Sequence, residues 1–150
     1  MNTDKNFIIK ETVKCRQDPI YTLKKYARIK HPTLGVIPFD LYAFQEDALD
    51  NFVHHRYNII LKGRQLGFST IVAGYVAWLI TFFRNKEVLL MAIKQETAKN
   101  LIDKVRLILD SFPEWIRPAT LQDNKLLIKV SNNSRVKAIS TTSDAGRSES

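Results

Sequence analysis

The chain has 150 residues and a formal net charge of +8, with 45% hydrophobic residues, 25% charged residues and a sequence pI near 9.7. Its length is that of one domain with a sizeable core, and its single cysteine, Cys15, excludes an internal disulfide and fits a reducing compartment. The positive charge favours a polyanionic partner, which means nucleic acid, a nucleotide or an anionic membrane surface.

The N-terminus is polar and charged, so it does not have the apolar segment of a signal peptide. The longest apolar stretch, residues 71–83, is shorter than the roughly 18 to 20 residues that span a bilayer. We therefore expect a protein that is not secreted and does not enter a membrane.

The first 36 residues predict a short helical segment. Pro19 can open a helix, and the following YTLKKYARI sets aromatic and aliphatic residues among basic ones before HPTLGVIPF interrupts the helix. The next segment, LYAFQEDALDNF, carries apolar residues at helical spacing and predicts an amphipathic helix that ends near His54 and His55.

The middle of the chain predicts two strands that alternate with two helices. Residues 57–62 and 87–93 are short apolar runs typical of buried strands. The run 71–83 predicts a helix covered on all sides, and residues from about 95 to 112 predict an amphipathic helix. This order of elements predicts a parallel sheet with right-handed crossovers.

Residues 125–140 predict a β-hairpin on the edge of the sheet. The two apolar runs KLLIKV and RVKAIS are separated by residues 131–134, in which Asn132 and Asn133 form a plausible tight turn. The last ten residues, TTSDAGRSES, form a polar tail with no predicted element.

The segment LKGRQLGFST, residues 61–70, deviates from the Walker A pattern G-x-x-x-x-G-K-[ST]. When Gly67 and Ser69 are aligned with the second glycine and the hydroxyl, Phe68 occupies the lysine position and Lys62 the first glycine position. A strand that turns through glycines into a helix presents backbone N–H groups to phosphate oxygens. The segment is therefore a phosphate-binding loop that lacks its usual cation, or a plain strand-to-helix connection with solvated basic residues.

Gln45 lies upstream of this segment, in the predicted amphipathic helix. A glutamine shortly before a P-loop strand can read the adenine edge, because its amide donates to N7 and accepts from the N6 amino group. Viewed alone, Gln45 is a solvent-facing helix residue.

Together these segments resemble the N-terminal ATPase region of the large terminase subunits of tailed bacteriophages, over nearly the whole chain. The resemblance is carried by DPIYTLKKYARIKHPTLGVIPFDLYAFQEDAL, LKGRQLGFST, VLLMAIKQETAKNLIDKV and AISTTSDAGRSES. It implies an α/β fold of the P-loop NTPase type, RecA-like with an additional strand, and a mainly parallel but incomplete sheet. Residues 1–36 then form the helical N-terminal segment and residues 37–150 a partial P-loop ATPase domain.

The resemblance also implies an enzyme, an ATPase that uses ATP and Mg²⁺ to move viral DNA into a preformed capsid. In the complete protein, Arg64 would sense the γ-phosphate and Arg147 would act on the nucleotide of a neighbouring subunit. The implied partners are double-stranded DNA, the portal protein and the small terminase subunit. The implied assembly is a homo-oligomeric ring in the host cell cytoplasm.

The nucleotide site predicted from the loop and the resemblance combines backbone amides, a magnesium ligand and a relocated cation. Ser69 is the candidate Mg²⁺ ligand, and Lys62 or Arg64 can fold back over the phosphates, which Phe68 cannot neutralise. The candidate nucleotide-binding residues are Gln45, Lys62, Gly63, Gln65, Gly67, Phe68, Ser69 and Thr70, of which Thr70 is expected to start the helix.

The sequence lacks two features of such ATPases. No apolar strand ends in the magnesium-binding aspartate and catalytic glutamate of a Walker B motif, and no carboxylate-rich nuclease domain follows. We therefore expect a truncated ATPase region that is inactive alone and, because its sheet is incomplete, unstable or prone to associate. The carboxylates predicted to be solvated surface charges are Asp103, Asp110, Asp123, Asp144 and Glu149.

Two other functions compete with this one. A helicase-like ATPase fragment shares the order of glutamine and P-loop, and a non-catalytic remnant would bind DNA or other subunits through its positive face. The three histidines do not have the spacing of a metal site. Trp78 and Trp115 are expected to be packing residues.

Overall fold

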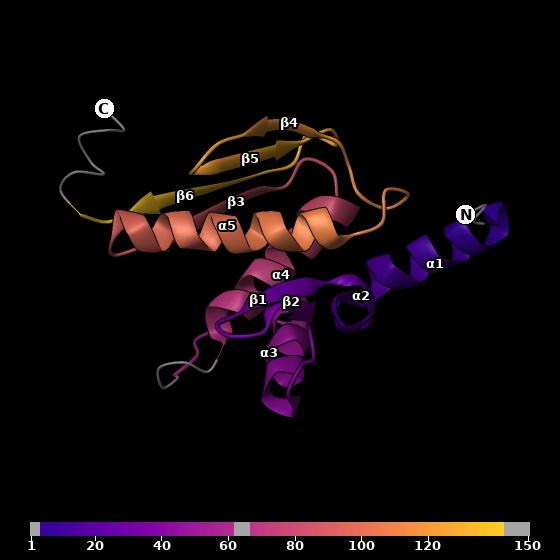
Figure 1. The fold of residues 1–150 in the computed structure, drawn as a ribbon, viewed down its shortest axis with the longest axis horizontal. Coiled ribbons are helices and arrows are strands. Elements are labelled where there is room, and N and C mark those ends of the chain that lie inside the picture. The colour runs from indigo at the N-terminus through magenta and orange to yellow at the C-terminus, as the bar shows by residue number, and fades with distance from the viewer. Residues whose placement is uncertain (1–3, 62–66, 143–150) are drawn as a thin grey trace.

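The computed structural model describes residues 4–61 and 67–142 (Figure 1). The helices and strands in this part of the chain are α1 (Lys5–Gln17), α2 (Pro19–Tyr26), β1 (Arg28–His31), β2 (Gly35–Pro38), α3 (Ala43–His54), α4 (Phe68–Phe82), β3 (Glu87–Ala92), α5 (Gln95–Ser111), β4 (Thr120–Asp123), β5 (Leu127–Val130) and β6 (Arg135–Ser140). The structure therefore confirms the amphipathic helices α3 and α5, the apolar helix α4 and the strand β3. It confirms the helical N-terminal segment only up to Tyr26, because Arg28 and Ile29, which were expected in the helix, begin the strand β1.

The main sheet mixes parallel and antiparallel pairs. Its order is β3-β6-β5-β4, with β3 parallel to β6 and with β5 antiparallel to both β6 and β4. The expectation of a mainly parallel sheet is therefore wrong for the described strands. The physical reason is loop length: β5 and β6 are joined by residues 131–134, which can only reverse the chain, whereas β3 and β6 are linked through α5.

The β5–β6 hairpin is confirmed, with Asn133 at φ 68° in its turn. Its position differs from the expectation, because β6 lies inside the sheet between β3 and β5. The edge on this side of the sheet is β4, an exposed strand that the sequence pattern did not reveal, and the opposite edge is β3.

The predicted strand at residues 57–62 is absent from residues 57–61, the part of it that the structure describes. These residues have no regular structure, and the side chains of Ile59 and Leu61 are 96% and 98% exposed. An apolar run becomes a strand only when a neighbouring strand pairs with it, and no described strand does so. Composition therefore indicated the wrong structure at this segment.

A second small sheet, the β1–β2 hairpin, forms where the sequence predicted only an interruption. The Nδ1 atom of His31 accepts hydrogen bonds from the backbone N–H groups of Thr33 and Leu34, both at 3.1 Å. Gly35 then takes φ +77°, which favours glycine. The hairpin contacts α5, so it places the N-terminal residues beside the helix that packs on the main sheet.

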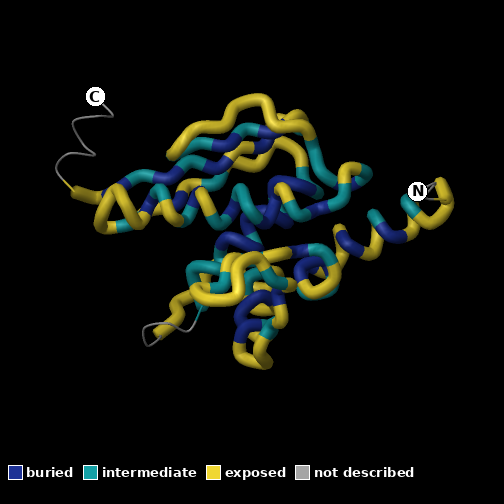
Figure 2. The backbone as a smooth tube through the Cα atoms, viewed as in Figure 1, coloured by how far each residue is buried: buried dark blue, intermediate teal, exposed yellow. Residues whose placement is uncertain are grey.

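The core lies between the sheet and the helices. α5 lies along one face of the sheet, and α4 runs between α5 and the α2–α3 region (Figure 1). The buried positions gather along α4 and between α5 and the sheet (Figure 2). Trp78 of α4 is 4% exposed and Trp115 packs against the core, so both are the packing residues that we predicted. No described helix has the length and apolar character needed to cross a membrane.

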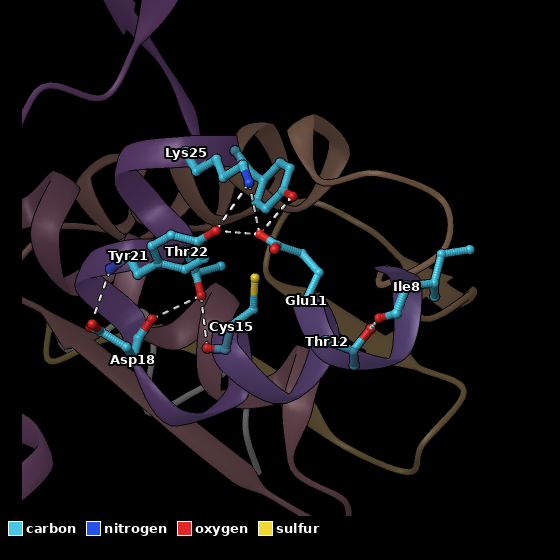
Figure 3. A network of polar contacts seen from close by, with 9 residues as sticks. Ile8, Glu11, Thr12, Cys15, Asp18, Tyr21, Thr22 and Lys25 are labelled. Carbon is cyan, nitrogen blue, oxygen red and sulfur yellow. Dashed lines mark hydrogen bonds and ion pairs between the residues drawn. The ribbon is translucent and has the colours of Figure 1, made fainter. Parts of the chain in front are cut away.

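A buried carboxylate fastens α1 to α2 (Figure 3). Oε1 of Glu11, a residue only 6% exposed, accepts hydrogen bonds from the Tyr21 hydroxyl at 2.6 Å, Lys25 Nζ at 3.0 Å and the Tyr26 hydroxyl at 3.0 Å. Burial opposes ionisation of this carboxyl, but the hydrogen bonds outweigh burial and hold the pKa of Glu11 below its ordinary value of 4.5. Glu11 is therefore ionised in the folded protein at neutral pH.

Replacing Glu11 by glutamine should lower the free energy of unfolding by about 1 to 3 kcal/mol, because three hydrogen bonds to a charged acceptor are weakened. Since the folded pKa lies below the unfolded one, this stabilisation is full above pH 4.5 and is lost as the pH falls through the lowered pKa. Urea denaturation at pH 7 and pH 3 measures both effects. Glu46→Gln, which removes the half-exposed ion pair with Lys24, is the matched control and should change stability little. Equal losses in the two variants would contradict this account.

The free edge of the sheet at β3 carries exposed apolar side chains. Leu90 faces the core, whereas Leu89 and Met91 point the other way and are 55% and 60% exposed. Among the described strands, β3 pairs only with β6, so its other edge offers unpaired backbone groups beside these side chains. This arrangement favours association between copies of the chain.

Introducing a lysine at Leu89 or Met91 should therefore reduce association, because a charge on an edge strand disfavours pairing with another chain. Sedimentation velocity over a range of protein concentrations measures this effect. Val13→Lys, at an exposed apolar residue of α1, is the control and should leave association unchanged. If all three variants associate as the wild type does, β3 is not the surface responsible.

Candidate functional site

A cleft of about 760 Å³ lies where the β1–β2 hairpin, the start of α3 and the first turn of α4 meet. This volume falls in the range of roughly 300 to 1,000 Å³ that is typical of small-molecule sites. The sequence-predicted residues that line it are Gln45, Gly67, Phe68, Ser69 and Thr70. The structure therefore brings together two parts of the predicted site that are separated by more than twenty positions in the sequence.

The remaining predicted site residues are Lys62, Gly63, Arg64, Gln65 and Arg147, and they lie outside the described part of the chain. Their expected roles stay predictions.

The two ends of α4 differ in the side chains that hydrogen-bond to their backbone groups. At the C-terminal end, the Asn132 side chain donates to the Ile80 carbonyl and the Ser134 hydroxyl donates to the Phe83 carbonyl, both at 2.7 Å. At the N-terminal end, the N-cap residue is Gly67, which has no side chain to cap the helix, and no acidic residue lies in the first turn. The cleft thus faces the positive end of the helix dipole.

The first turn of α4 begins at Gly67, which has φ 70° and ψ 18° in the left-handed region. The helix starts at Phe68 and therefore two residues before Thr70, where we expected it. The first intrahelical bond among the described residues joins the Ile71 N–H to the Gly67 carbonyl at 3.1 Å. The N–H groups that precede this bond point out of the helix end, in the arrangement that binds anions.

Gln45 is only 5% exposed, so the interpretation of it as a solvent-facing residue is wrong. Its Oε1 accepts a hydrogen bond from the Tyr42 N–H at 2.9 Å, and its Nε2 lies 2.9 Å from the position that a Cβ atom on Gly67 would take. Gln45 therefore connects the start of α3 to the start of α4. The capping role had a signal in the sequence, because glutamine is favoured three residues after a helix N-cap.

Phe68, at the position of the Walker A lysine, packs against the aromatic residues of α3. Its ring centroid lies 6.0 Å from that of Phe44, which in turn stacks on Tyr42 at 5.8 Å with an interplanar angle of 8°. Phe68 also packs against the core. This contact gives the apolar side chain at position 68 a structural role that the loop pattern did not suggest.

Two lysines that the sequence analysis did not single out also line the cleft. Lys30 is exposed on β1, and Lys104 is half-buried on α5. Desolvation lowers the pKa of Lys104 from its ordinary value. No motif marks these residues, because only the packing of the hairpin against α5 brings them to the cleft.

The described acidic and histidine residues form no cluster of three or more that could hold a metal ion. Asp103 and Asp123 both bond Arg106 at 2.7 Å on the surface, in agreement with the prediction that they are surface charges. His31 supports the hairpin turn, and His54 lies 3.2 Å from Asp50.

No protein-family model matches the chain. Among solved structures, the chain is similar to the HK97 bacteriophage large terminase, with a TM-score of 0.64 and 19% sequence identity. The match covers 83% of this chain and 27% of that terminase, so this chain spans about a quarter of its length. It confirms the predicted resemblance at the level of the fold, which is a mixed α/β domain similar to part of a large terminase.

The contact between Gln45 and Gly67 can be tested by Gly67→Ala. A side chain at φ +70° costs about 1 to 2 kcal/mol, and the new Cβ would also displace the Gln45 amide. Gly35→Ala is a matched control, because Gly35 has φ +77° and no atom lies within 4 Å of its Cβ position. We expect the Gly67 variant to lose more stability in thermal denaturation. In a Gln45→Ala background the two alanine substitutions should cost the same, and a persistent difference would contradict the contact.

Proposed function

We propose that this chain binds ATP and is the N-terminal part of a DNA-packaging motor ATPase, a large terminase. One observation carries the proposal: Gln45 and the first turn of α4, which the sequence marked as adenine-reading and phosphate-binding, line the same cleft. The fold similarity to the HK97 large terminase supports it independently of these residues.

The cleft fits a nucleotide chemically. Backbone N–H groups and the dipole of α4 would hold phosphate oxygens, and no acidic residue in the first turn opposes them. Ser69 would supply a hydroxyl ligand to Mg²⁺, which neutralises phosphate charge when it is bound. The Gln45 amide, which lines the cleft, would read the adenine edge as the sequence predicts.

The cation that is absent at position 68 would come from elsewhere in the loop. Phe68 packs on Phe44, so the side chain at position 68 contributes an apolar contact and no positive charge. Lys62 or Arg64 would neutralise the phosphates, as the sequence predicts. Arg64 would then contribute mainly to the transition state, where charge develops on the transferred phosphoryl group.

The packaging role belongs to the proposal for the complete protein. The net charge of +8 fits double-stranded DNA as a partner, and such binding would be independent of sequence and sensitive to salt. The portal protein, the small terminase subunit and a ring in which Arg147 reaches a neighbouring nucleotide follow from the resemblance.

Titration of a fluorescent ATP analogue in the presence of Mg²⁺ tests the binding. We expect the wild type to bind weakly and Ser69→Ala to bind more weakly still. Lys62→Ala should weaken binding by about 1.5 to 3 kcal/mol, the value of a lost charge-assisted hydrogen bond. Lys125→Ala, an exposed lysine outside the cleft, should bind as the wild type does. A wild type that does not bind the analogue would refute the proposed function, and unchanged affinity in Lys62→Ala would mean that the cation is not Lys62.

A further inference from the structure

A second cavity, of about 400 Å³, adjoins the cleft on the side of α5. It lies between β1, the first turn of α4 and the middle of α5. It shares Ile29, Lys30, Pro32, Thr70 and Lys104 with the cleft. Lys104 therefore lines both cavities, together with Thr70 of the α4 first turn. Gln45 lies beside Gly67 and lines the cleft but not the second cavity.

Lys104 is a half-buried cation without a carboxylate partner among the described residues. The described ion pairs do not include it. Asp103 lines the second cavity with Lys104 but bonds Arg106 at 2.7 Å, and Asp40 lines the cleft without forming a described ion pair with Lys104. Holding an ammonium group partly out of water without a counter-ion is unfavourable. An anion delivered into the cleft would reverse this cost, because the opposite charge favours the ammonium form.

The aliphatic stem of Lys104 gives a competing explanation. A lysine stem can cover apolar surface while its charged end reaches water, and Ile29 and Ile108 line the same cavity. That explanation accounts for the burial of the stem. It does not account for a cationic residue in the same cavity lining as Thr70 of the α4 first turn, because the helix dipole there is also positive and repels a second cation.

We infer that Lys104 contacts the phosphates of the bound nucleotide from α5, and thereby adds a positive charge from outside the loop. This inference rests on the nucleotide binding proposed above and names a binding residue outside the loop. It implies that affinity depends on the number of phosphates, because Lys104 recognises charge and not the base.

The test compares Lys104→Met, which keeps the stem and removes the charge, with Lys104→Arg, which keeps the charge. Isothermal titration with ATP, ADP and adenosine in the presence of Mg²⁺ measures each affinity. Lys104→Met should weaken ATP and ADP binding about tenfold or more, as expected for a lost charge-assisted hydrogen bond, and leave adenosine binding unchanged. Lys104→Arg should retain most of the ATP affinity.

Lys99→Met is the matched control, because Lys99 is a half-buried lysine of the same helix that lines neither cavity. It should bind ATP as the wild type does. Thermal denaturation without nucleotide supplies a second measurement: Lys104→Met should be at least as stable as the wild type, because it removes a desolvated charge.

The outcomes separate the two proposals. A wild type that binds none of the three ligands refutes the proposed function itself. A wild type that binds ATP, together with unchanged ATP affinity in Lys104→Met, refutes the role of Lys104 alone. Equal losses for ATP and adenosine, or a less stable Lys104→Met protein, would show that the stem acts by packing and would also overturn the inference.

Discussion

Burial of α4 is the constraint on which the rest of the structure depends. This helix is apolar on nearly every side, so it has to be covered all round by other elements. Gly74 permits the close approach of Leu23 from α2, and the Trp78 indole donates to the Cys15 carbonyl at 2.8 Å. Because α2, α3 and α5 all pack on α4, their positions relative to its first turn are set by the core. The cleft is therefore formed by the packing that stabilises the fold.

The sequence predicted the elements whose signal is local. The apolar stripe of α5 and the tight turn at Asn132 and Asn133 depend on spacing and on backbone preference, and both were found as expected. The β1–β2 hairpin was missed because a side chain, His31, organises its turn. Residues 57–61 were wrongly expected to form a strand, since an apolar run alone does not specify a pairing partner.

The candidate site could be predicted only in part, for the same reason. Gln45 and residues 67–70 carry pattern signals, and they do line one cleft. Tertiary packing buries Gln45, places Phe68 against Phe44 and brings Lys104 to the cleft. The spacing of residues along the chain does not indicate any of these contacts. A motif therefore indicates where phosphate can bind, whereas the packing decides which other side chains accompany it.

The hydrogen bonds from Asn132 and Ser134 to the end of α4 also have a mechanical meaning. The helix has 15 residues and spans about 22 Å, and its internal hydrogen bonds make it stiff along its axis. The N-terminal end lines the cleft, and the carbonyl groups of the C-terminal end accept hydrogen bonds from Asn132 and Ser134 of the β5–β6 turn. α4 therefore couples the cleft mechanically to the β5–β6 turn, because an axial displacement of a stiff helix at one end also moves its other end. Because of these two hydrogen bonds, a displacement of α4 would change the position of the β5–β6 turn, although this turn is distant from the cleft.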